Sequence, residues 1–515
     1  MSSGVTVPGE VPARPRPEPD EAGTAWLLAR PRPGLLVAAC IFGAAMIGAA
    51  VARKPLDGLA LFLGLIVATV VAARPAFGAY LLTLVVPITS GFEKGFPIPN
   101  VNLSEALIAV VGMILLLVAP RRAEFRWQAF DWMLFAFCGG WLVLGLLDAL
   151  DMHTGLSYST IDPLIGPFQF LILYRAIAVS LRTKAERRTA IACLLVASVP
   201  VDILAFLQQT RAHLVNSAIA HVTGGSIFQT YNYLQFARAT GPFPHWTVLA
   251  GYLIVILLIG FACLVFGVEL PISRRAVGTI LLLNAVALIL TAEISAIAGA
   301  IAGAIRIGGW AGKRKQMVRW LITGLIVTAV FGGTYLVKRL DTEFATQAGS
   351  GRNPFVPQTI SFRWQVWTGQ YFPAIIERPL IGWGQALPDT INWPYTESQY
   401  VTVLMAGGIP LLVVFGGEMV ALYGQSRRQA RRKDLEDSAT PAALGNAVAT
   451  LVVVLVPMDA IYPYMTSGGL PEPLFVAAGI AAACVYWGRR SPISGTESNA
   501  EADPQVLAAV AAPKL

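Results

Sequence analysis

Charged side chains are scarce in this sequence. Of its 515 residues, 13% are charged and 55% are hydrophobic, and the mean hydropathy is +0.62. Soluble domains carry about 25% charged residues, so lipid must be the main solvent of this chain. Cysteine is scarce too. All five cysteines lie inside apolar runs, as small buried hydrophobic residues do and disulfide or metal sites do not: Cys40, Cys138, Cys193, Cys263 and Cys484.

The sequence also lacks several motifs of soluble enzymes. It has no glycine-rich phosphate loop, no zinc-ligand spacing and no Ser-His-Asp set. We therefore expect no cofactor and no metal. No cleavable signal peptide is evident, and residues 1–32, rich in proline, arginine and glutamate, are predicted to form a disordered cytoplasmic tail. Residues 489–515 are predicted to form a second one.

What the sequence does contain is a series of apolar runs within residues 33–488. About 20 apolar residues cross roughly 30 Å of hydrocarbon, and a backbone in lipid must satisfy its own hydrogen bonds, which favours helices. We predict an all-α, polytopic membrane bundle with about 14 spans, or 12 as the alternative count. The spans are expected at 34–52, 56–73, 76–89, 103–119, 130–147, 164–181, 190–207, 246–266, a hairpin over 277–305 interrupted at Glu293, 320–337, 401–423, 442–456 and 474–487.

The basic residues lie in short loops between these runs, which accounts for the net charge of +8 without a nucleic-acid partner. Six basic loops fall on one side, beginning at Arg121, Arg182, Arg274, Lys313, Arg427 and Arg489. That side is predicted to be the cytoplasm, with both termini inside. One short basic loop, with Arg53 and Lys54, falls on the other side. The two longest loops, 208–244 and 338–400, then face outward, and long loops are often functional.

These outer loops are rich in arginine and aromatic residues. Arg238 lies in the first loop, and Arg363 and Arg378 lie in the second, together with Trp367 and Trp383. Guanidinium groups match phosphate oxygens in pairs, and aromatic faces stack on apolar faces such as those of sugar rings. The combination indicates a lipid-linked, phosphorylated glycan. The alternative is an interfacial aromatic belt with arginines that reach lipid headgroups.

Two short segments of the second loop stand out. The stretch 371–377 can form a short apolar helix, which Pro379, Gly382 and Gly384 would end. Glu397 then opens the next apolar run. It is either a favourable charge at a helix start, with a neighbouring hydroxyl as the cap, or a base that takes a proton from a sugar hydroxyl.

Four segments together resemble the O-antigen ligase and Wzy-type polymerase superfamily. The run from Arg238 to Phe243, RATGPF, is similar to its R-A-T-G-x-F segment. Arg363 with Trp367, and then RPLIGWG from Arg378, resemble its R-x-x-x-W and P-L-x-G-x-G segments. Glu397 and Ser398, nine residues and then Gly408 resemble H-[NSQ]-x9-G. Glutamate where the ligases carry histidine favours a polymerase-like member.

The resemblance implies metal-independent, inverting glycosyl transfer from a polyprenyl-diphosphate-linked saccharide on the outer face of the cytoplasmic membrane. Arg238 and Arg363 would bind the diphosphate, and Glu397 would orient or deprotonate the acceptor hydroxyl. The expected substrate-binding residues are Arg378, Gln399, His245, Trp367 and Trp383, and the expected turn residues are Pro379, Gly382, Gly384 and Gly408. Transfer to a separate acceptor, as in a ligase, is the nearest alternative.

Two other functions compete with this prediction. A transporter or flippase would use charges inside the membrane, and the main candidates are Glu293, Asp202 and Glu418. A non-catalytic scaffold in polysaccharide export would need none of these residues. The expected partners are the glycan, the lipid bilayer and other polysaccharide-assembly membrane proteins.

Overall fold

A computed structural model describes residues 55–94, 102–119, 127–151, 158–210, 212–224, 238–313, 357–385, 387–435 and 437–488, with isolated positions between 315 and 341. The regular elements of this part of the chain are helices, with no strand among them, so the predicted all-α fold is confirmed. The predicted tails and the predicted span at 34–52 lie outside the described residues, as does most of the span at 320–337. The chain divides into two compact units between Thr69 and Val70, and every contact below lies within the second.

Seven segments of the described chain are long and apolar enough to cross a membrane. They are α7 (Ala129–Asp151), Ile161–Ser180, which includes α9 (Phe168–Ser180), α10 (Lys184–Gln209), α13 (Trp246–Phe266), α14 (Arg274–Thr291), α19 (Gln399–Ala430) and α20 (Ala439–Asp459). Five shorter apolar segments lie in α3 (Pro55–Ala73), α4 (Pro75–Thr89), the continuous run α5 (Leu103–Leu107), η1 (Ile108–Gly112) and α6 (Met113–Val118), α15 (Ile294–Trp310) and α21 (Pro471–Trp487). Together, these twelve segments match twelve of the fourteen predicted spans.

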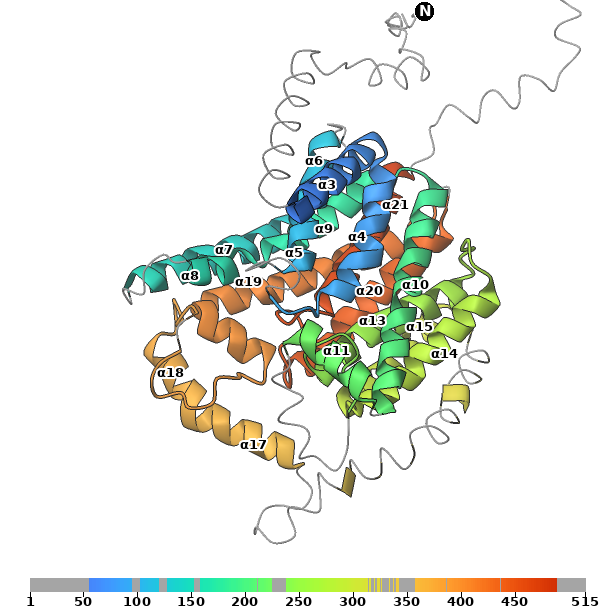
Figure 1. Cartoon of the computed structure of the whole chain (residues 1–515). Coiled ribbons are helices and arrows are strands. Elements are labelled where there is room, and N and C mark those ends of the chain that lie inside the picture. Colours follow the sequence, from blue (N-terminus) through green and yellow to red (C-terminus); the bar gives the residue numbers. More distant parts are fainter. Residues whose placement is uncertain are drawn as a thin grey trace, which may run out of the picture. The chain divides into compact units, whose positions relative to one another are not determined.

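Helix α13 lies at the centre of its neighbours and contacts α14, α15 and α20 (Figure 1). Its sequence is apolar on every side, so it can be buried along almost its whole length. Helix α19 packs against α7 and α20, and α21 packs against α9. The start of α19 lies near the end of α20, where the Tyr400 hydroxyl donates to the Val456 carbonyl at 2.6 Å. The start of α13 lies near the same end, because His245 stacks on Tyr462 just after α20.

The predicted hairpin over 277–305 is confirmed. Helix α14 ends at Thr291, and α15 begins at Ile294. Between them, Ala292 has φ of 50° in the left-handed region, which makes the reversal tight. Arg238 stabilises this turn from outside. Its Nε donates to the Thr291 carbonyl at 2.7 Å, and its Nη2 donates to the Ala292 carbonyl at 2.9 Å.

Ion pairs gather three basic loops at one end of the bundle. Arg188, in the first turns of α10, pairs with Glu269 after α13 at 3.0 Å and with Asp437 before α20 at 3.2 Å. The α14–α15 turn and the start of α19 lie at the opposite ends of their helices. The basic loops around 188, 269 and 437 thus share one side, as the sequence predicts. The assignment of that side to the cytoplasm stays a prediction.

The two long loops contain helices of their own. The first contains α11 (His213–Thr223), a helix within the predicted loop 208–244. The second forms α17 (Gln358–Val366), η3 (Trp367–Tyr371) and α18 (Phe372–Glu377). The predicted helix at 371–377 is therefore present. Val366, Tyr371 and Ala374 pack against Val401 and Met405 of α19, which fixes the second loop to the start of that helix.

Candidate functional site

Within the second loop, the segment 379–383 lies against the middle of α19 and is called here the strap. The backbone of α19 is non-helical at Gly407 and Gly408, so it kinks there. The strap bonds to both sides of the kink: Ile409 N donates to the Pro379 carbonyl at 2.8 Å, and Trp383 N donates to the Met405 carbonyl at 2.6 Å. Backbone N–H and C=O groups that lose their helical hydrogen bonds at the kink therefore bond to the strap. Buried backbone groups of this kind need such partners.

Two glycines let the strap and the kink approach. Gly382 has φ of 70°, and a Cβ there would lie 2.5 Å from the Met405 carbonyl oxygen. Gly408 has φ of 65°, and its Cβ would lie 2.4 Å from the Pro379 carbonyl oxygen. Both positions need the left-handed region and a missing side chain at once. Gly384, with φ of 59°, packs in the same way against the Asp148 carboxylate, 2.6 Å from its would-be Cβ.

Beside the strap lies a cavity of about 1280 Å³. Its lining comes from the segment before α13 and the first turn of that helix, the α14–α15 turn, the second loop, the start of α19, Trp141 of α7, and the connection between α20 and α21. Its polar and aromatic lining includes Arg238, His245, Trp246, Glu293, Ser295, Arg363, Trp393, Tyr395, Glu397 and Tyr462. The structure therefore brings the three predicted catalytic residues, Arg238, Arg363 and Glu397, to one cavity.

The first charged pair of the cavity is Arg238 with Glu293. Their side chains meet at 3.1 Å, and the guanidinium carbon of Arg238 lies 4.1 Å from the centre of the Trp246 ring. The second oxygen of Glu293 accepts from the Ser295 hydroxyl at 2.8 Å. Because Arg238 also holds the two carbonyls of the hairpin turn, this pair is built into the fold.

The second charged pair is Arg363 with Glu397. Arg363, in the last turn of α17, directs Nε and Nη2 to the same oxygen of Glu397, Oε2, at 3.3 and 3.2 Å. Among the described residues, no hydrogen bond to Oε1 of Glu397 is found. The Glu397 side chain is 21% exposed. One carboxylate oxygen is therefore held, and the other is open to the cavity.

The backbone of Glu397 is strained. Its φ is 54°, a left-handed value that costs a residue other than glycine about 1–3 kcal/mol. Trp367 lies one turn after Arg363 and donates to the Thr396 carbonyl at 2.7 Å, which fixes the segment just before the glutamate. Ser398 occupies the N-cap position but makes no side-chain capping bond, and its hydroxyl donates to the Asp459 carbonyl at 3.2 Å.

Two rings lie between the charged pairs. His245 stacks on Tyr462 with ring centres 5.6 Å apart, and its Nδ1 accepts from Thr247 N at 3.2 Å, which caps α13. Burial, with the positive charges of Arg238 and Arg363, lowers the pKa of His245 to about 3. Burial raises the pKa of the Tyr462 hydroxyl, and both Glu397 and Glu293 add to this. His245 is thus neutral at pH 7, and Tyr462 is a hydrogen-bond donor.

The low pKa of His245 predicts an acid-sensitive fold. Because the unfolded side chain takes a proton near pH 6.5 and the folded one only near pH 3, stability should fall as the pH drops below about 6.5. The loss between pH 7.5 and pH 5 is expected to reach up to about 2 kcal/mol. His245→Asn keeps a capping oxygen and should weaken this pH dependence of the melting temperature. His213→Asn, at an exposed histidine, should leave it unchanged, and equal slopes in all three proteins would contradict the prediction.

The other predicted substrate-binding residues lie outside the cavity lining. Arg378 pairs with Asp148 at 2.9 Å and with Asp151 at 2.7 Å, which ties the end of α18 to the end of α7. The Gln399 side-chain oxygen accepts from the backbone of Met465 at 3.0 Å.

The two predicted tryptophans likewise support the loop. Trp367 and Trp383 donate to backbone carbonyls and pack against the loop cluster. The aromatic lining comes instead from other residues, among them Trp246, Trp393, Tyr395 and Tyr462. Tyr462 was missed because it belongs to a short connection between spans, although its DAIYPYMTSGG sequence is unusually polar and aromatic for one.

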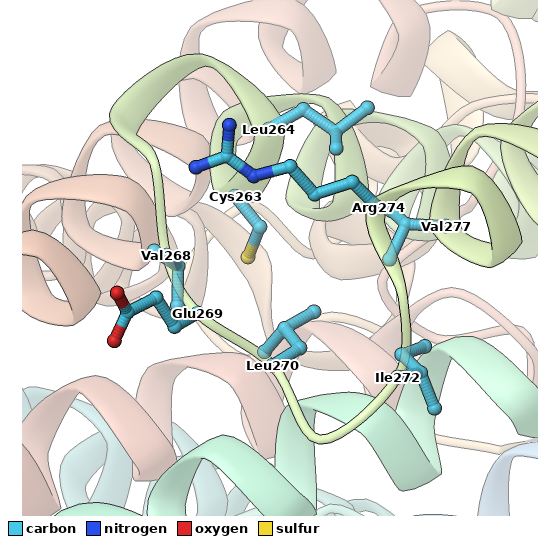
Figure 2. A pocket seen from close by; sticks show the side chains of 8 residues that line it. All are labelled: Cys263, Leu264, Val268, Glu269, Leu270, Ile272, Arg274 and Val277. Carbon is cyan, nitrogen blue, oxygen red and sulfur yellow. The ribbon is translucent and has the colours of Figure 1, made fainter.

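A smaller pocket of about 230 Å³ lies at the opposite end of α13. Figure 2 shows it within the turn from α13 to α14, lined by Cys263, Leu264, Val268, Glu269, Leu270, Ile272, Arg274 and Val277. Glu269 pairs with Arg188, and most of the other lining residues are apolar. This pocket contains none of the candidate residues.

Residues 279–416 match a family model described as O-antigen ligase. The predicted resemblance is confirmed over this segment, which extends from α14 to Gly416 in α19. It contains Glu293, Arg363 and Glu397, whereas Arg238 and Tyr462 lie outside it. A comparison with curated proteins finds no match.

Proposed function

We propose, on the premise that residues 279–416 form an O-antigen ligase-like domain in a multi-pass membrane protein, that this chain is a glycosyltransferase. Its donor would be a polyprenyl-diphosphate-linked oligosaccharide, and its site would be the cavity that contains Arg363 and Glu397. The acidic residue at position 397 favours polymerisation over transfer to a separate acceptor. With the basic loops in the cytoplasm of the cell, this cavity opens at the outer face of the inner membrane.

One observation carries the proposal: Glu397 is held in a strained backbone by an arginine on one oxygen, with its other oxygen open to the cavity. Strain of this kind is kept where the surrounding structure imposes it, often at active sites. A carboxylate with one open oxygen beside a hydroxyl acceptor can take its proton. A carboxylate that served only the helix start would not need the left-handed backbone.

The reaction would proceed by direct displacement. The acceptor hydroxyl oxygen attacks the anomeric carbon of the donor sugar from the face opposite the diphosphate. The bond from that carbon to the phosphate oxygen breaks, and the diphosphate leaves with the electron pair. The acceptor proton passes to Oε1 of Glu397. The configuration at the anomeric carbon is thereby inverted, and arginine supplies the positive charge that the leaving diphosphate needs.

Arg363 is the better diphosphate ligand of the two arginines. Its Nε and Nη2, the two donors that match phosphate oxygens, are held only by one oxygen of a partly exposed carboxylate. A diphosphate can take these donors and release Glu397 at the same moment. The same two nitrogens of Arg238 hold backbone carbonyls of the hairpin turn, so Arg238 would act mainly by its charge and by fixing Glu293.

One observation favours the transporter alternative. Asp202 in α10 is fully buried, and neither of its carboxylate oxygens has a partner among the described residues. Buried acids within membrane helices often mark ion or proton paths. A transporter would therefore depend on Asp202 more than on Glu397.

A transfer assay separates these functions. Purified protein in lipid vesicles would receive polyprenyl-diphosphate oligosaccharides extracted from the cells that make it, and products would be separated by length. We expect longer lipid-linked glycans. Transfer only to a different added acceptor would assign ligase activity. An intact protein that makes no product with any acceptor but moves the lipid-linked glycan across the bilayer would overturn the proposal, and Asp202→Asn would then be expected to abolish that movement.

A further inference from the structure

At the basic end of the bundle, two arginines enclose one tryptophan. The guanidinium carbons of Arg306 in α15 and Arg427 in α19 lie 4.6 and 3.8 Å from the centre of the Trp310 ring. Arg306 also donates to the Tyr423 hydroxyl at 3.2 Å, and Arg427 donates to the side-chain oxygen of Asn446 in α20. These contacts hold both guanidinium groups in place at the ends of three helices. Arg306, Trp310 and Arg427 are called here the arginine clamp.

The clamp has no acidic partner among the described residues. Several other arginines of the bundle do have one, as in Arg175–Asp131, Arg188–Asp437 and Arg432–Asp434. The Nε of Arg306 is buried and makes no hydrogen bond within the described part of the chain. Two like charges fixed beside one ring repel each other, and guanidinium groups match phosphate oxygens. The clamp is therefore an anion site by charge and by geometry.

An apolar stripe leads up α19 from the clamp. Val420, Gly416 and Val413 lie seven, eleven and fourteen residues before Arg427, so the 3.6-residue period places them on the helix face that bears Arg427. All three are exposed, Val420 at 71% and Val413 at 66%. At about 1.5 Å per residue, the distance along α19 from Arg427 to Val413 is roughly 20 Å, on the order of one leaflet of a bilayer.

We propose that this surface binds one phospholipid with an anionic headgroup, its phosphate on Arg306 and Arg427 and one acyl chain along Val420, Gly416 and Val413. The unpaired charge selects an anion, and the exposed apolar stripe that begins beside it selects a lipid over a free phosphate. Zwitterionic lipids satisfy the stripe but leave net positive charge at the clamp. The site lies at the end of the bundle opposite the proposed catalytic cavity and does not depend on what that cavity does.

The test is a lipid-dependent thermal shift on the full chain, purified in a neutral detergent. Three additions would be made in separate samples: phosphatidylglycerol, phosphatidylcholine, and inorganic phosphate without lipid. Wild type should be stabilised by phosphatidylglycerol well beyond phosphatidylcholine. The doubly substituted protein Arg306→Gln, Arg427→Gln should bind phosphatidylglycerol at least about tenfold more weakly, because it loses charge-assisted hydrogen bonds, and should respond to both lipids alike.

Arg432→Gln is the matched control. It removes one positive charge from the same end of the bundle, but Arg432 is already paired with Asp434 at 2.6 Å, so the preference for phosphatidylglycerol should persist. Equal loss in Arg432→Gln and the double variant would show a general charge effect and overturn the proposal, as would equal responses of wild type to both lipids. A full shift with inorganic phosphate alone would assign a free-anion site instead. If the double variant fails to fold, native mass spectrometry of wild type decides the question. One retained phosphatidylglycerol is expected, and no retained lipid would overturn the proposal.

Discussion

Glu397→Gln is expected to lower the rate of glycan transfer by about 10²- to 10⁴-fold, the usual contribution of a general base. The amide occupies the same volume but cannot accept the acceptor proton at Oε1. The ion pair with Arg363 is partly exposed, and pairs of that kind contribute on the order of 1 kcal/mol or less, so the melting temperature should stay close to that of wild type. Initial rates with a lipid-linked oligosaccharide, beside a melting curve, measure both effects.

Glu377→Gln is the control for this prediction. Glu377 lies at the end of α18 in the same loop and is exposed, so the same chemical change there should leave the rate within about twofold of wild type, as at most surface positions. If the Glu397→Gln protein is as active as wild type, Glu397 is not the base and serves only to hold Arg363.

The two arginines should respond differently to truncation. Arg363→Ala leaves the hairpin turn untouched, so transfer should fall steeply with a small change in melting temperature. Arg238→Ala removes the bonds to the Thr291 and Ala292 carbonyls and leaves Glu293 without its cation. Leaving such partners unpaired costs about 1–3 kcal/mol, so this protein should lose stability as well as activity. Equal losses of stability in both variants would contradict the division of roles proposed for them.

The spans could be predicted from the sequence because lipid imposes a simple rule on every long apolar run. Twelve of the predicted spans coincide with helices of the structure. The reversal at Glu293 could be predicted because the apolar run there is too long for one crossing. The catalytic candidates were predicted on short motifs whose residues converge on one cavity. Local pattern and family resemblance selected Arg238, Arg363 and Glu397, and the fold places all three in the lining of that cavity. Their catalytic roles stay a prediction.

The supporting residues could not be predicted, because their partners are remote in sequence. Arg378 resembles a phosphate ligand in its motif, but Asp148 lies 230 residues away and meets it only in the folded chain. Gln399 is one position from a hydroxyl-rich helix start, yet its side chain turns to the connection before α21. Periodicity indicates which side of a helix is apolar, but it does not indicate which loop will lie over that side.

Gly408→Ala is expected to destabilise the protein by about 3 kcal/mol or more and to lower transfer in the folded fraction. The added Cβ would lie 2.4 Å from the Pro379 carbonyl oxygen, against backbone that cannot rotate away. It would also force a residue with a side chain into a conformation, φ 65° and ψ −163°, that is essentially restricted to glycine, at a cost of about 1–3 kcal/mol. Relief requires the strap to move off the kink, which breaks the bonds from Ile409 to Pro379 and from Trp383 to Met405. Melting curves and initial rates test both effects.

Gly416→Ala provides the comparison within the same helix. Nothing lies within 4 Å of a Cβ at Gly416, and alanine favours an α-helix over glycine by roughly 1 kcal/mol, so this variant should be as stable as wild type or slightly more. Because the strap joins α19 to the loop that supplies Arg363, its displacement in Gly408→Ala should separate Arg363 from Glu397. A Gly408→Ala protein with wild-type stability would mean that the strap does not rest on the kink. One that is unstable but fully active would mean that the strap is not needed to position Arg363.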